Sequence, residues 1–251
     1  MNLHLKPIGI LHAPFKEKFA VPRQAGLVMS VEAQLELFAE FSQGETLRGL
    51  EDFSHIWLIF AFHQNQERGW HPTVRPPRLG GNRRVGVFAS RSPFRPNPLG
   101  LSAVALTRIE PRPKGAILHL RGTDLVDGTP VYDIKPYLPY SDALPDAQGA
   151  FAPQRPARRE VCFSPTAEID LLHHKEHYPH LRQLITDVLA LDPRPAYRSR
   201  QRDEHSYAVR IYDLELRWEV RGEILYVSRI SPWREEAEVV KNQRQSSCHR
   251  Q

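Results

Sequence analysis

The chain has 251 residues, of which 41% are hydrophobic and 25% are charged, values that are ordinary for a soluble globular protein with one large or two smaller domains. No apolar run approaches the roughly 18 residues of a membrane-spanning helix, and the N-terminus lacks the features of a secretory signal. The net charge of +5 favours an anionic partner. Because Cys162 and Cys248 match no disulfide or metal pattern, we expect a reduced, cytoplasmic protein.

The first part of the chain is predicted to be rich in β-strands. The stretch "IGILHAPF" indicates a short strand that ends in a turn, and residues 53–62 form an apolar run typical of a strand covered on both faces. Residues 31–41 permit either a helix or a strand. Three further strands are predicted, over residues 83–90, 100–110 and 116–126. The loops between them are rich in Gly, Pro and Asn, so we predict a small β-barrel with long loops over residues 1–143.

A change of composition follows the predicted barrel. Residues 144–159 are rich in Ala, Pro, Gln and Arg and have no sustained periodicity, which is typical of a linker. A smaller α+β domain is predicted over residues 160–233, which makes the chain α+β overall. The last residues, 234–251, form a polar tail.

The elements of this second domain are indicated by local signals. Ser164 followed by Pro165 is a typical helix start. Apolar residues recur at helical spacing from Leu181 to Leu189, and "DPRP" ends that helix. Residues 207–230 are predicted to form two strands joined near Arg221 and Gly222.

Arginine is concentrated in one part of the barrel half. Between residues 68 and 109 the chain carries no acidic residue and eight arginines, namely Arg68, Arg75, Arg78, Arg83, Arg84, Arg91, Arg95 and Arg108. Because these alternate with strand-like runs, we expect a folded basic face, and planar guanidinium groups suit phosphate or carboxylate. A solvated surface without a partner is the alternative interpretation.

The loop "SRSPFRPNP" combines Arg91 and Arg95 with three prolines. Proline fixes φ, so the loop loses little entropy when a ligand orders it. It is therefore either a preorganised cradle for an anionic or polar small molecule or a rigid connection between strands, and composition does not separate the two.

Two other segments carry polar side chains suited to a site. The stretch "GTDLVDGTPVYDIKPYLPYSD" combines carboxylates with tyrosines and a lysine, which can act as acids, bases and a stacking surface. Within it, Asp127 and Gly128 form an ordinary turn signal, so we expect Asp127 to be structural. His63 and Gln64 follow the apolar run and can line a pocket at the end of a strand.

Several well-known motifs are missing from the sequence. There is no GxGxxG after a strand, no GxxxxGK[ST], no GxSxG and no HExxH, which argues against a dinucleotide fold, a P-loop, a nucleophile elbow and a zinc protease. His173 and His177 have helical i, i+4 spacing, but no third ligand is close in the sequence. We therefore predict a solvated helix face there and no metal.

Taken together, these segments resemble the TsaA-like methyltransferase family over nearly the whole chain except the linker and the tail after Ser231. The similarity lies in "EKFAVPRQAGLV", "GLEDFSHIWLIFAFHQN", "WHPTVRPPRLGGNRRVGVFASRSPFRPNPLGLS", "DLVDGTPVYDIKPYLPYSDALPDA", "DPRPAYR" and "YAVRIYDLELRW". The bacterial members to which it is most similar methylate N6 of threonylcarbamoyladenosine at position 37 of certain tRNAs. The resemblance therefore implies a tRNA adenine N6-methyltransferase.

The resemblance also implies a β-barrel that binds S-adenosylmethionine, of neither the Rossmann nor the knotted type, and a homodimer with the cofactor near the subunit interface. By position, the cofactor contacts are expected at Gln24, Ala25, Gly26, His63, Gln64, Arg91, Ala103, Thr123, Asp124, Leu125 and Val126. One departure is Pro93, where members of the family can have threonine. Proline stiffens the loop there and removes no side chain that the cofactor needs.

The chemistry of these residues agrees with the expected ligand. Arg91 can pair with the cofactor carboxylate, Asp124 can offset a positive charge, and Asp133 is the predicted general base for the N6 proton. Aromatic side chains can stack on a base splayed out of the anticodon loop. The predicted RNA contacts are Arg83, Arg84, Arg95, Tyr137, Tyr140, Arg194 and Arg198. We expect the second domain to help select the tRNA and to contribute little to methyl transfer.

Two other hypotheses remain open on the sequence. The same barrel could serve a non-catalytic RNA-binding protein, which would not bind S-adenosylmethionine in the absence of RNA. A methyltransferase acting on a small metabolite would show no salt-sensitive affinity for RNA.

Overall fold

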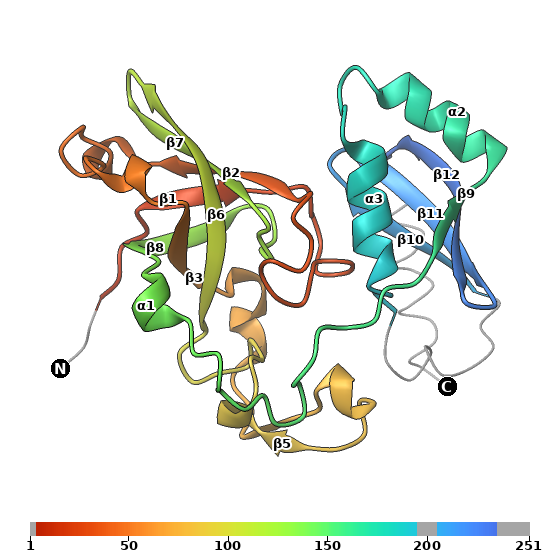
Figure 1. The fold of residues 1–251 in the computed structure, drawn as a ribbon, viewed down its shortest axis with the longest axis horizontal. Coiled ribbons are helices and arrows are strands. Elements are labelled where there is room, and N and C mark those ends of the chain that lie inside the picture. Colours follow the sequence, from red (N-terminus) through yellow and green to blue (C-terminus); the bar gives the residue numbers. More distant parts are fainter. Residues whose placement is uncertain (1–3, 195–204, 235–251) are drawn as a thin grey trace.

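The computed structural model describes residues 4–194 and 205–234, which form a β-barrel and a second, α+β domain joined by an extended segment (Figure 1). Six strands close the barrel in the order β1-β2-β7-β6-β3-β8, and every neighbouring pair is antiparallel. They are β1 (Gly9–His12), β2 (Glu32–Leu37), β3 (His55–Ala61), β6 (Leu99–Arg112), β7 (Gly115–Arg121) and β8 (Thr129–Pro136). The predicted small barrel is confirmed.

Alternation of apolar and polar residues explains which side of each barrel strand faces inward. In β2, Ala33, Leu35 and Leu37 are buried while the residues between them are exposed, because successive side chains of a strand point to opposite faces. Residues 31–41 therefore contain a strand, one of the two possibilities left open, followed by a short 3-10 helix. The inward side chains of all six strands form one apolar core, which includes Leu11, Leu35, Leu58, Val104, Leu118 and Val131.

The prediction that the apolar run at residues 53–62 is covered on both faces is wrong. In β3, Ile56, Leu58 and Phe60 point into the barrel, whereas Trp57 and Ile59 alternate with them and are only partly covered. The outer face of β3 is therefore apolar without belonging to the barrel core.

The prediction of a barrel strand over residues 83–90 is wrong. Only Val85–Gly86 (β5) is extended, pairing with Thr73–Val74 (β4) in a separate two-stranded ribbon. The strand predicted to reach residue 126 ends at Arg121, because Gly122 adopts φ = +76°. Strand β8 was not predicted.

The short helices of this half are α1 (Pro139–Asp142) and the 3-10 turns Ala39–Phe41, Leu50–Asp52, His63–Arg68, Pro77–Leu79 and Val87–Ala89.

The second domain packs two helices on a four-stranded sheet of order β10-β11-β12-β9. Its elements are β9 (Val161–Phe163), α2 (Pro165–His174), α3 (Leu181–Ala190), β10 (Ser206–Ile211), β11 (Leu214–Arg221) and β12 (Ile224–Pro232). The predicted start of α2 is confirmed, since the Ser164 hydroxyl accepts a hydrogen bond of 3.0 Å from the Ala167 amide. The predicted apolar face of α3 is also confirmed, because Leu181, Leu184, Ile185, Val188 and Leu189 are buried.

The prediction of two strands over residues 207–230 is wrong, because three strands are present. The missed turn lies between β10 and β11, where Tyr212 adopts φ = +56°. Neither glycine nor proline marks this turn, and Asp213 is its single typical turn residue. The turn near Gly222, which was predicted, joins β11 to β12.

The segment between β1 and β2, residues 13–31, joins the two domains. Phe15, Val28 and Val31 are buried in the hydrophobic core of the second domain and not in the barrel core. Phe15 also forms an isolated antiparallel bridge with Ile211 of β10. The core of the second domain therefore contains residues from the N-terminal part of the chain.

Candidate functional site

The loop Gln24–Gly26 is held against the end of β7 by backbone hydrogen bonds. The Gly26 amide donates to the Gly122 carbonyl at 2.8 Å, and the Gly122 amide donates to the Val31 carbonyl at 2.9 Å. Both glycines have positive φ, +73° and +76°, a conformation that other residues rarely adopt. A side chain at Gly122 would also meet the sulfur of Met29. These two glycines therefore fix the loop close to residues 122–126.

Asp124 lies beside that loop and connects it to the barrel interior. The Ser102 hydroxyl, on the inner side of β6, donates a hydrogen bond of 2.6 Å to Asp124 Oδ1, and the backbone amide of Ala25 also donates to the carboxylate. Burial raises the pKa of the Asp124 carboxyl, opposed by these hydrogen bonds and by the charge of Arg91. A partly buried carboxylate is suited to a cationic ligand.

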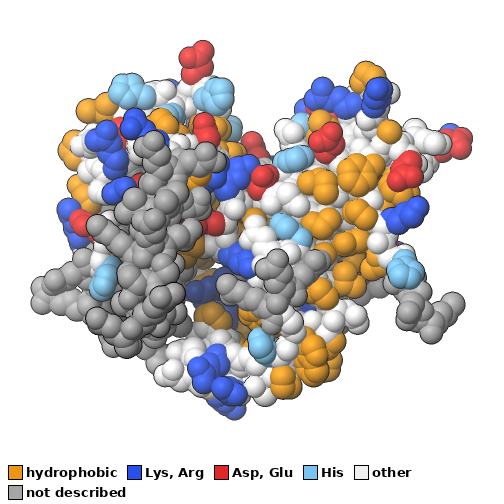
Figure 2. All heavy atoms as spheres, turned by 180° about the vertical axis from the view of Figure 1, so that it is seen from behind, with side chains coloured by type: hydrophobic (Ala, Val, Ile, Leu, Met, Phe, Trp, Pro, Cys, Tyr) orange, Lys and Arg blue, Asp and Glu red, His pale blue; other side chains and the backbone are white. Residues whose placement is uncertain are grey.

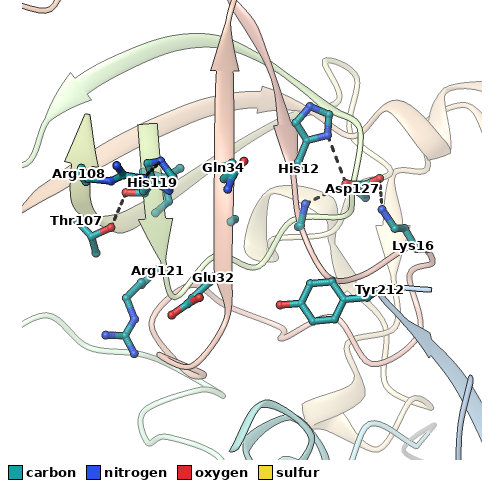
Figure 3. A pocket seen from close by; sticks show the side chains of 13 residues that line it. His12, Lys16, Glu32, Gln34, Thr107, Arg108, His119, Arg121, Asp127 and Tyr212 are labelled. Atoms are coloured by element: carbon teal, nitrogen blue, oxygen red, sulfur yellow. Dashed lines mark hydrogen bonds and ion pairs between the residues drawn. The ribbon is translucent and has the colours of Figure 1, made fainter. Parts of the chain in front are cut away.

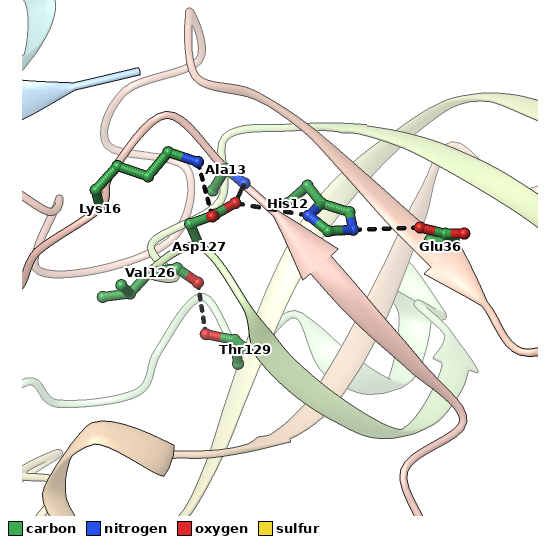
Figure 4. Close-up of polar contacts among 7 residues, drawn as sticks. All are labelled: His12, Ala13, Lys16, Glu36, Val126, Asp127 and Thr129. Carbon is green, nitrogen blue, oxygen red and sulfur yellow. Dashed lines mark hydrogen bonds and ion pairs between the residues drawn. The ribbon is translucent and has the colours of Figure 1, made fainter. Parts of the chain in front are cut away.

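The neighbours of Asp124 in sequence are largely structural in this conformation. Thr123 and Leu125 are buried, with exposed fractions of 0% and 2%, and the Leu125 amide donates to the Thr123 hydroxyl at 3.3 Å. The Val126 carbonyl accepts a hydrogen bond of 2.6 Å from the Thr129 hydroxyl (Figure 4).

Arg91 reaches the same place from the proline-rich loop. Its guanidinium donates a hydrogen bond to the Gln24 side-chain oxygen and is otherwise exposed. Arg95, four residues later, donates instead to the carbonyls of Val87 and Ser90, at 3.3 and 2.7 Å. The loop is thus braced by Arg95 and presents Arg91, a pattern that favours the cradle over the rigid connection.

His63 and Gln64 form a second group at the end of β3. Both lie in a 3-10 turn, and the Lys18 ammonium donates to the Gln64 carbonyl at 2.7 Å and to the Asn65 side chain. Burial and the charge of Lys18 lower the pKa of the His63 imidazole, so it is neutral at pH 7. Lys18 belongs to residues 13–31, the segment that also carries the Gln24–Gly26 loop.

Ala103 and Asp133 are on the outer face of the barrel, away from the inward-pointing Ser102. Ala103 pairs with Trp57 of β3, while Asp133 of β8 pairs with Ile59. The Asp133 side chain is about half exposed and forms a 2.9 Å ion pair with Lys135. The predicted cofactor and catalytic residues therefore fall into an inner group around Asp124 and an outer group on β3, β6 and β8.

The predicted RNA contacts have different environments. Arg83 and Arg84 are exposed beside β5 and form no hydrogen bond or ion pair with another described residue. Tyr140 is 86% exposed on α1, whose Asp142 accepts hydrogen bonds from Trp57 and from the Leu138 amide, so the segment is anchored. Tyr137 packs against the Trp57 ring, 5.6 Å between centroids.

Arg194 does not suit the role predicted for it. Its side chain is 2% exposed and forms hydrogen bonds of 2.8 Å with both carboxylate oxygens of Asp192. A buried, paired guanidinium cannot reach an RNA phosphate without rearrangement, so the prediction of Arg194 as an RNA contact is wrong. Arg198 lies outside the described residues.

A cavity of about 620 Å³ lies between the barrel and the second domain. Figure 2 shows the molecule hollowed between its two halves, and Figure 3 shows the cavity walls, with His12, Glu32 and Arg121 on barrel strands and Tyr212 on the second domain. Its charges are mixed. We do not place the cofactor there, because Gln24, Arg91 and Asp124 are not among its walls.

Asp127, at the edge of this cavity, is structural as the turn signal predicts. Its carboxylate accepts hydrogen bonds from the Ala13 amide at 3.0 Å and from Lys16 at 2.7 Å, with His12 at 3.7 Å (Figure 4). These contacts fix the start of residues 13–31. Gly128, with φ = +75°, completes the turn.

Two features of the described residues bear on metals and membranes. In residues 4–194 and 205–234, no three His, Cys, Asp or Glu side chains are grouped so as to hold a metal ion. Within the same ranges, no helix is both long and apolar enough to span a bilayer.

Ser102 and Lys18 contact residues of the candidate site and were not predicted. Ser102 is the single hydroxyl at an inward position of the apolar stretch Leu99–Leu106, so its place in the alternation was an available signal. Lys18 had no such signal, because its contact with the turn after β3 depends on the path of residues 13–31.

Comparison with known proteins identifies relatives along both domains. Residues 10–143 match the family model of the tRNA-methyltransferase O N-terminal domain, and residues 156–233 match that of the TrmO C-terminal domain. The tRNA (adenine(37)-N6)-methyltransferase of Escherichia coli (strain K12) is 50% identical over 233 residues, which cover 92% of this chain and 99% of that protein. A protein of Pseudomonas aeruginosa, whose name refers to S-adenosylmethionine-dependent methyltransferases, is 46% identical over 87% of this chain and 93% of its own length.

Solved structures agree with these relatives. A crystal structure of TrmO superimposes with a TM-score of 0.77 at 38% identity, covering 92% of this chain and all of that one. A crystal structure of TrmO from Pseudomonas aeruginosa gives a TM-score of 0.76 at 37% identity, with coverage of 92% and 99%. The arrangement of barrel and second domain is thus shared with both.

Proposed function

The chain belongs to the TrmO family of S-adenosylmethionine-dependent tRNA (adenine(37)-N6)-methyltransferases, and we propose that its substrate is threonylcarbamoyladenosine at position 37, which it converts to the N6-methyl derivative. The observation that carries the assignment of the site is the convergence of Gln24–Gly26, Arg91 and Asp124. These residues come from three distant segments and meet through side-chain and backbone hydrogen bonds.

The charges of this inner group fit the cofactor. S-adenosylmethionine supplies a methyl group on a cationic sulfonium and carries an ammonium, a carboxylate and an adenine ring. Arg91 would bind the carboxylate as a charge-assisted pair, and the partly buried Asp124 would face a positive group. Val126 would wall the adenine, whereas Leu125, a predicted contact, is buried in the barrel core and would not reach it. The raised pKa of Asp124 fits this role, because a cationic ligand would favour its charged form.

We infer that the active unit is a homodimer, formed through the outer face of β3, β6 and β8. Leu99 and Leu101 are 37% and 55% exposed there, and Ile59 lies beside Leu101 on the neighbouring strand. Ala103, a predicted cofactor contact, is on the same face. A partner subunit on this face would cover apolar side chains and bring the outer group into the site.

The dimer is tested by replacing one exposed leucine. Leu101→Glu is expected to convert a dimer to a monomer in light scattering and to weaken S-adenosylmethionine binding. Leu172→Glu is the matched control, since Leu172 is 68% exposed on α2 of the second domain. A monomeric wild-type protein, or a Leu101→Glu variant that remains dimeric, would contradict the proposed interface.

Asp133 remains our proposed acceptor of the N6 proton. The new bond forms between N6 and the methyl carbon while the carbon–sulfur bond breaks, so N6 must lose one proton, and a nearby carboxylate can take it. Asp133 would have to leave its ion pair with Lys135 to do so. Asp133→Asn is expected to lower kcat and to leave the Kd for S-adenosylmethionine unchanged. An unaltered kcat would remove this residue from the chemistry.

Exposed groups beside the site are proposed to bind the tRNA. Arg83 and Arg84 would contact phosphates, and Tyr140, anchored through Asp142, would stack on a base of the anticodon loop. Because its substrate is tRNA, we infer that the protein acts in the cytoplasm.

Nucleoside mass spectrometry of tRNA tests the substrate. A strain lacking the gene should contain threonylcarbamoyladenosine without its N6-methyl derivative, and the complemented strain should regain the methylated nucleoside. Equal amounts of the methylated nucleoside in both strains would contradict the proposal.

A further inference from the structure

The loop proposed to bind the cofactor is flanked on both sides by residues buried in the second domain. Phe15 precedes the loop and Val28 and Val31 follow it, and all three are at most 1% exposed. They pack in one cluster with Leu184 and Val188 of α3. The path of the cofactor loop therefore depends on apolar contacts made by the C-terminal part of the chain.

A polar contact fixes the same segment to α3. The Ser30 hydroxyl donates a hydrogen bond of 2.7 Å to Asp187 Oδ2. Asp187 also accepts from Gln183 at 2.9 Å and from Arg158, and its side chain is 15% exposed. Among these donors to Asp187, only Ser30 belongs to residues 13–31. Its hydrogen bond therefore connects that segment to the second domain.

Backbone hydrogen bonds continue from Ser30 to the cofactor site. Val31, the next residue, accepts from the Gly122 amide, and Gly122 accepts from Gly26 at 2.8 Å. The adjacent Ala25 amide donates to Asp124. At the other end of the loop, Arg23, which precedes Gln24, donates to the carbonyl of Arg194 just beyond α3 at 3.4 Å. Contacts thus run without a gap from α3 to Asp124 and Gln24.

We propose that Asp187 is a positioning residue for the cofactor site, and that the second domain, through Asp187 and Ser30, sets the conformation of Gln24–Gly26 and hence the affinity for S-adenosylmethionine. The proposal rests on the proposed cofactor site. It departs from the expectation that the second domain helps select the tRNA and contributes little to methyl transfer. The domain would be part of the cofactor site without touching the cofactor.

Ser30→Ala tests the link with the smallest change, since it removes only the hydroxyl. We expect the Kd for S-adenosylmethionine, measured by calorimetry without RNA, to rise by about 3- to 30-fold, the range of coupling carried by one positioned contact. Ser30→Thr keeps the hydroxyl and should bind nearly as the wild type does. In turnover assays the KM for S-adenosylmethionine should rise, while the KM for tRNA stays the same.

Arg158→Gln is the matched control. It removes another donor to Asp187 but leaves the Ser30 hydroxyl in place, so it should not change cofactor affinity. Asp187→Ala removes the acceptor of the Ser30 hydrogen bond. Combined with Ser30→Ala, it should be no worse than the more severe single variant, because both break the same contact.

The outcomes separate this inference from the cofactor assignment. A folded Ser30→Ala variant with wild-type affinity for S-adenosylmethionine would overturn the positioning role while the proposed function stands. An equal loss of affinity in Ser30→Ala and Arg158→Gln would also overturn it, because the effect would then be general destabilisation. If the wild-type protein binds no S-adenosylmethionine, the proposed function itself fails.

Discussion

The Ser102 hydroxyl donates a 2.6 Å hydrogen bond to Asp124, linking the inner side of β6 to the loop that follows β7. The Asp124 carboxylate is partly buried and its pKa is raised, so a bound cation would stabilise its charged form. We expect Asp124→Asn to weaken S-adenosylmethionine binding by about 1.5–3 kcal/mol, as for loss of a charged hydrogen-bond partner. Calorimetry measures this directly, and an unchanged affinity would remove Asp124 from the site.

The same substitution should stabilise the free protein at neutral pH. Since the folded-state pKa of Asp124 is raised above its ordinary 3.8, the folded protein holds this proton more tightly than the unfolded chain does. Stability from this group is therefore lost as pH rises from about 3.8 through the raised value. Asparagine avoids that loss, so Asp124→Asn should raise Tm at pH 7, and the gain in Tm should shrink as the pH is lowered towards 3.8. A lower Tm at pH 7 would contradict this.

Arg91→Ala is expected to weaken S-adenosylmethionine binding by about 1.5–3 kcal/mol, because the carboxylate of the cofactor would lose a charge-assisted hydrogen bond. Arg48→Ala is the control, since Arg48 is exposed and pairs with Glu45 elsewhere on the barrel. Equal affinities of the two variants would exclude Arg91 as the carboxylate ligand.

The Arg83→Ala, Arg84→Ala double variant should bind tRNA with a weaker dependence on salt. Each phosphate contact releases about one counterion when the tRNA binds. Loss of two contacts should therefore make the slope of log K against log salt concentration shallower by about 1 to 2. Filter binding at several salt concentrations provides the slopes. If both proteins give the same slope, these arginines belong to a solvated surface.

A truncated chain that ends at Gly149 should not retain a native cofactor site. Phe15, Val28 and Val31 would be exposed, and each side chain contributes about 1.5–3 kcal/mol when buried, against a typical total stability of about 5–15 kcal/mol. We therefore expect loss of cooperative unfolding and of S-adenosylmethionine binding, monitored by circular dichroism and calorimetry. A cooperatively folded barrel with wild-type affinity would show that the segment does not need the second domain.

The parts of the fold that could be predicted are those whose pattern is local. Helix α3 follows from the period of its apolar residues, because one of its faces meets a core, and the start of α2 follows from Ser164 and Pro165. The period of residues 31–41 did not decide between helix and strand. The turn at Tyr212 and the short β5 could not be predicted. At Tyr212 a non-glycine residue takes a positive φ, and the apolar residues after β5 form a 3-10 turn that tertiary contacts select.

The candidate site was predictable only through resemblance to a family. Gln24, Arg91 and Asp124 are brought together by closure of the barrel, which no local pattern encodes. For Arg194 the charge alone was misleading. It suggested an RNA contact, but the side chain is buried and paired with Asp192. The contact of residues 13–31 with the second domain could not be read from composition either, since Phe15 and Val28 are equally suited to either core.

The central claim is that this chain transfers a methyl group from S-adenosylmethionine to N6 of threonylcarbamoyladenosine at position 37. The most direct test incubates the purified protein and labelled S-adenosylmethionine with one tRNA in two forms, with and without the threonylcarbamoyl group, and identifies the labelled nucleoside by mass spectrometry. We predict N6-methylated threonylcarbamoyladenosine from the modified tRNA and little or no label in the unmodified one. Equal labelling of adenine in the unmodified tRNA, or no labelled nucleoside in either form, would contradict the claim.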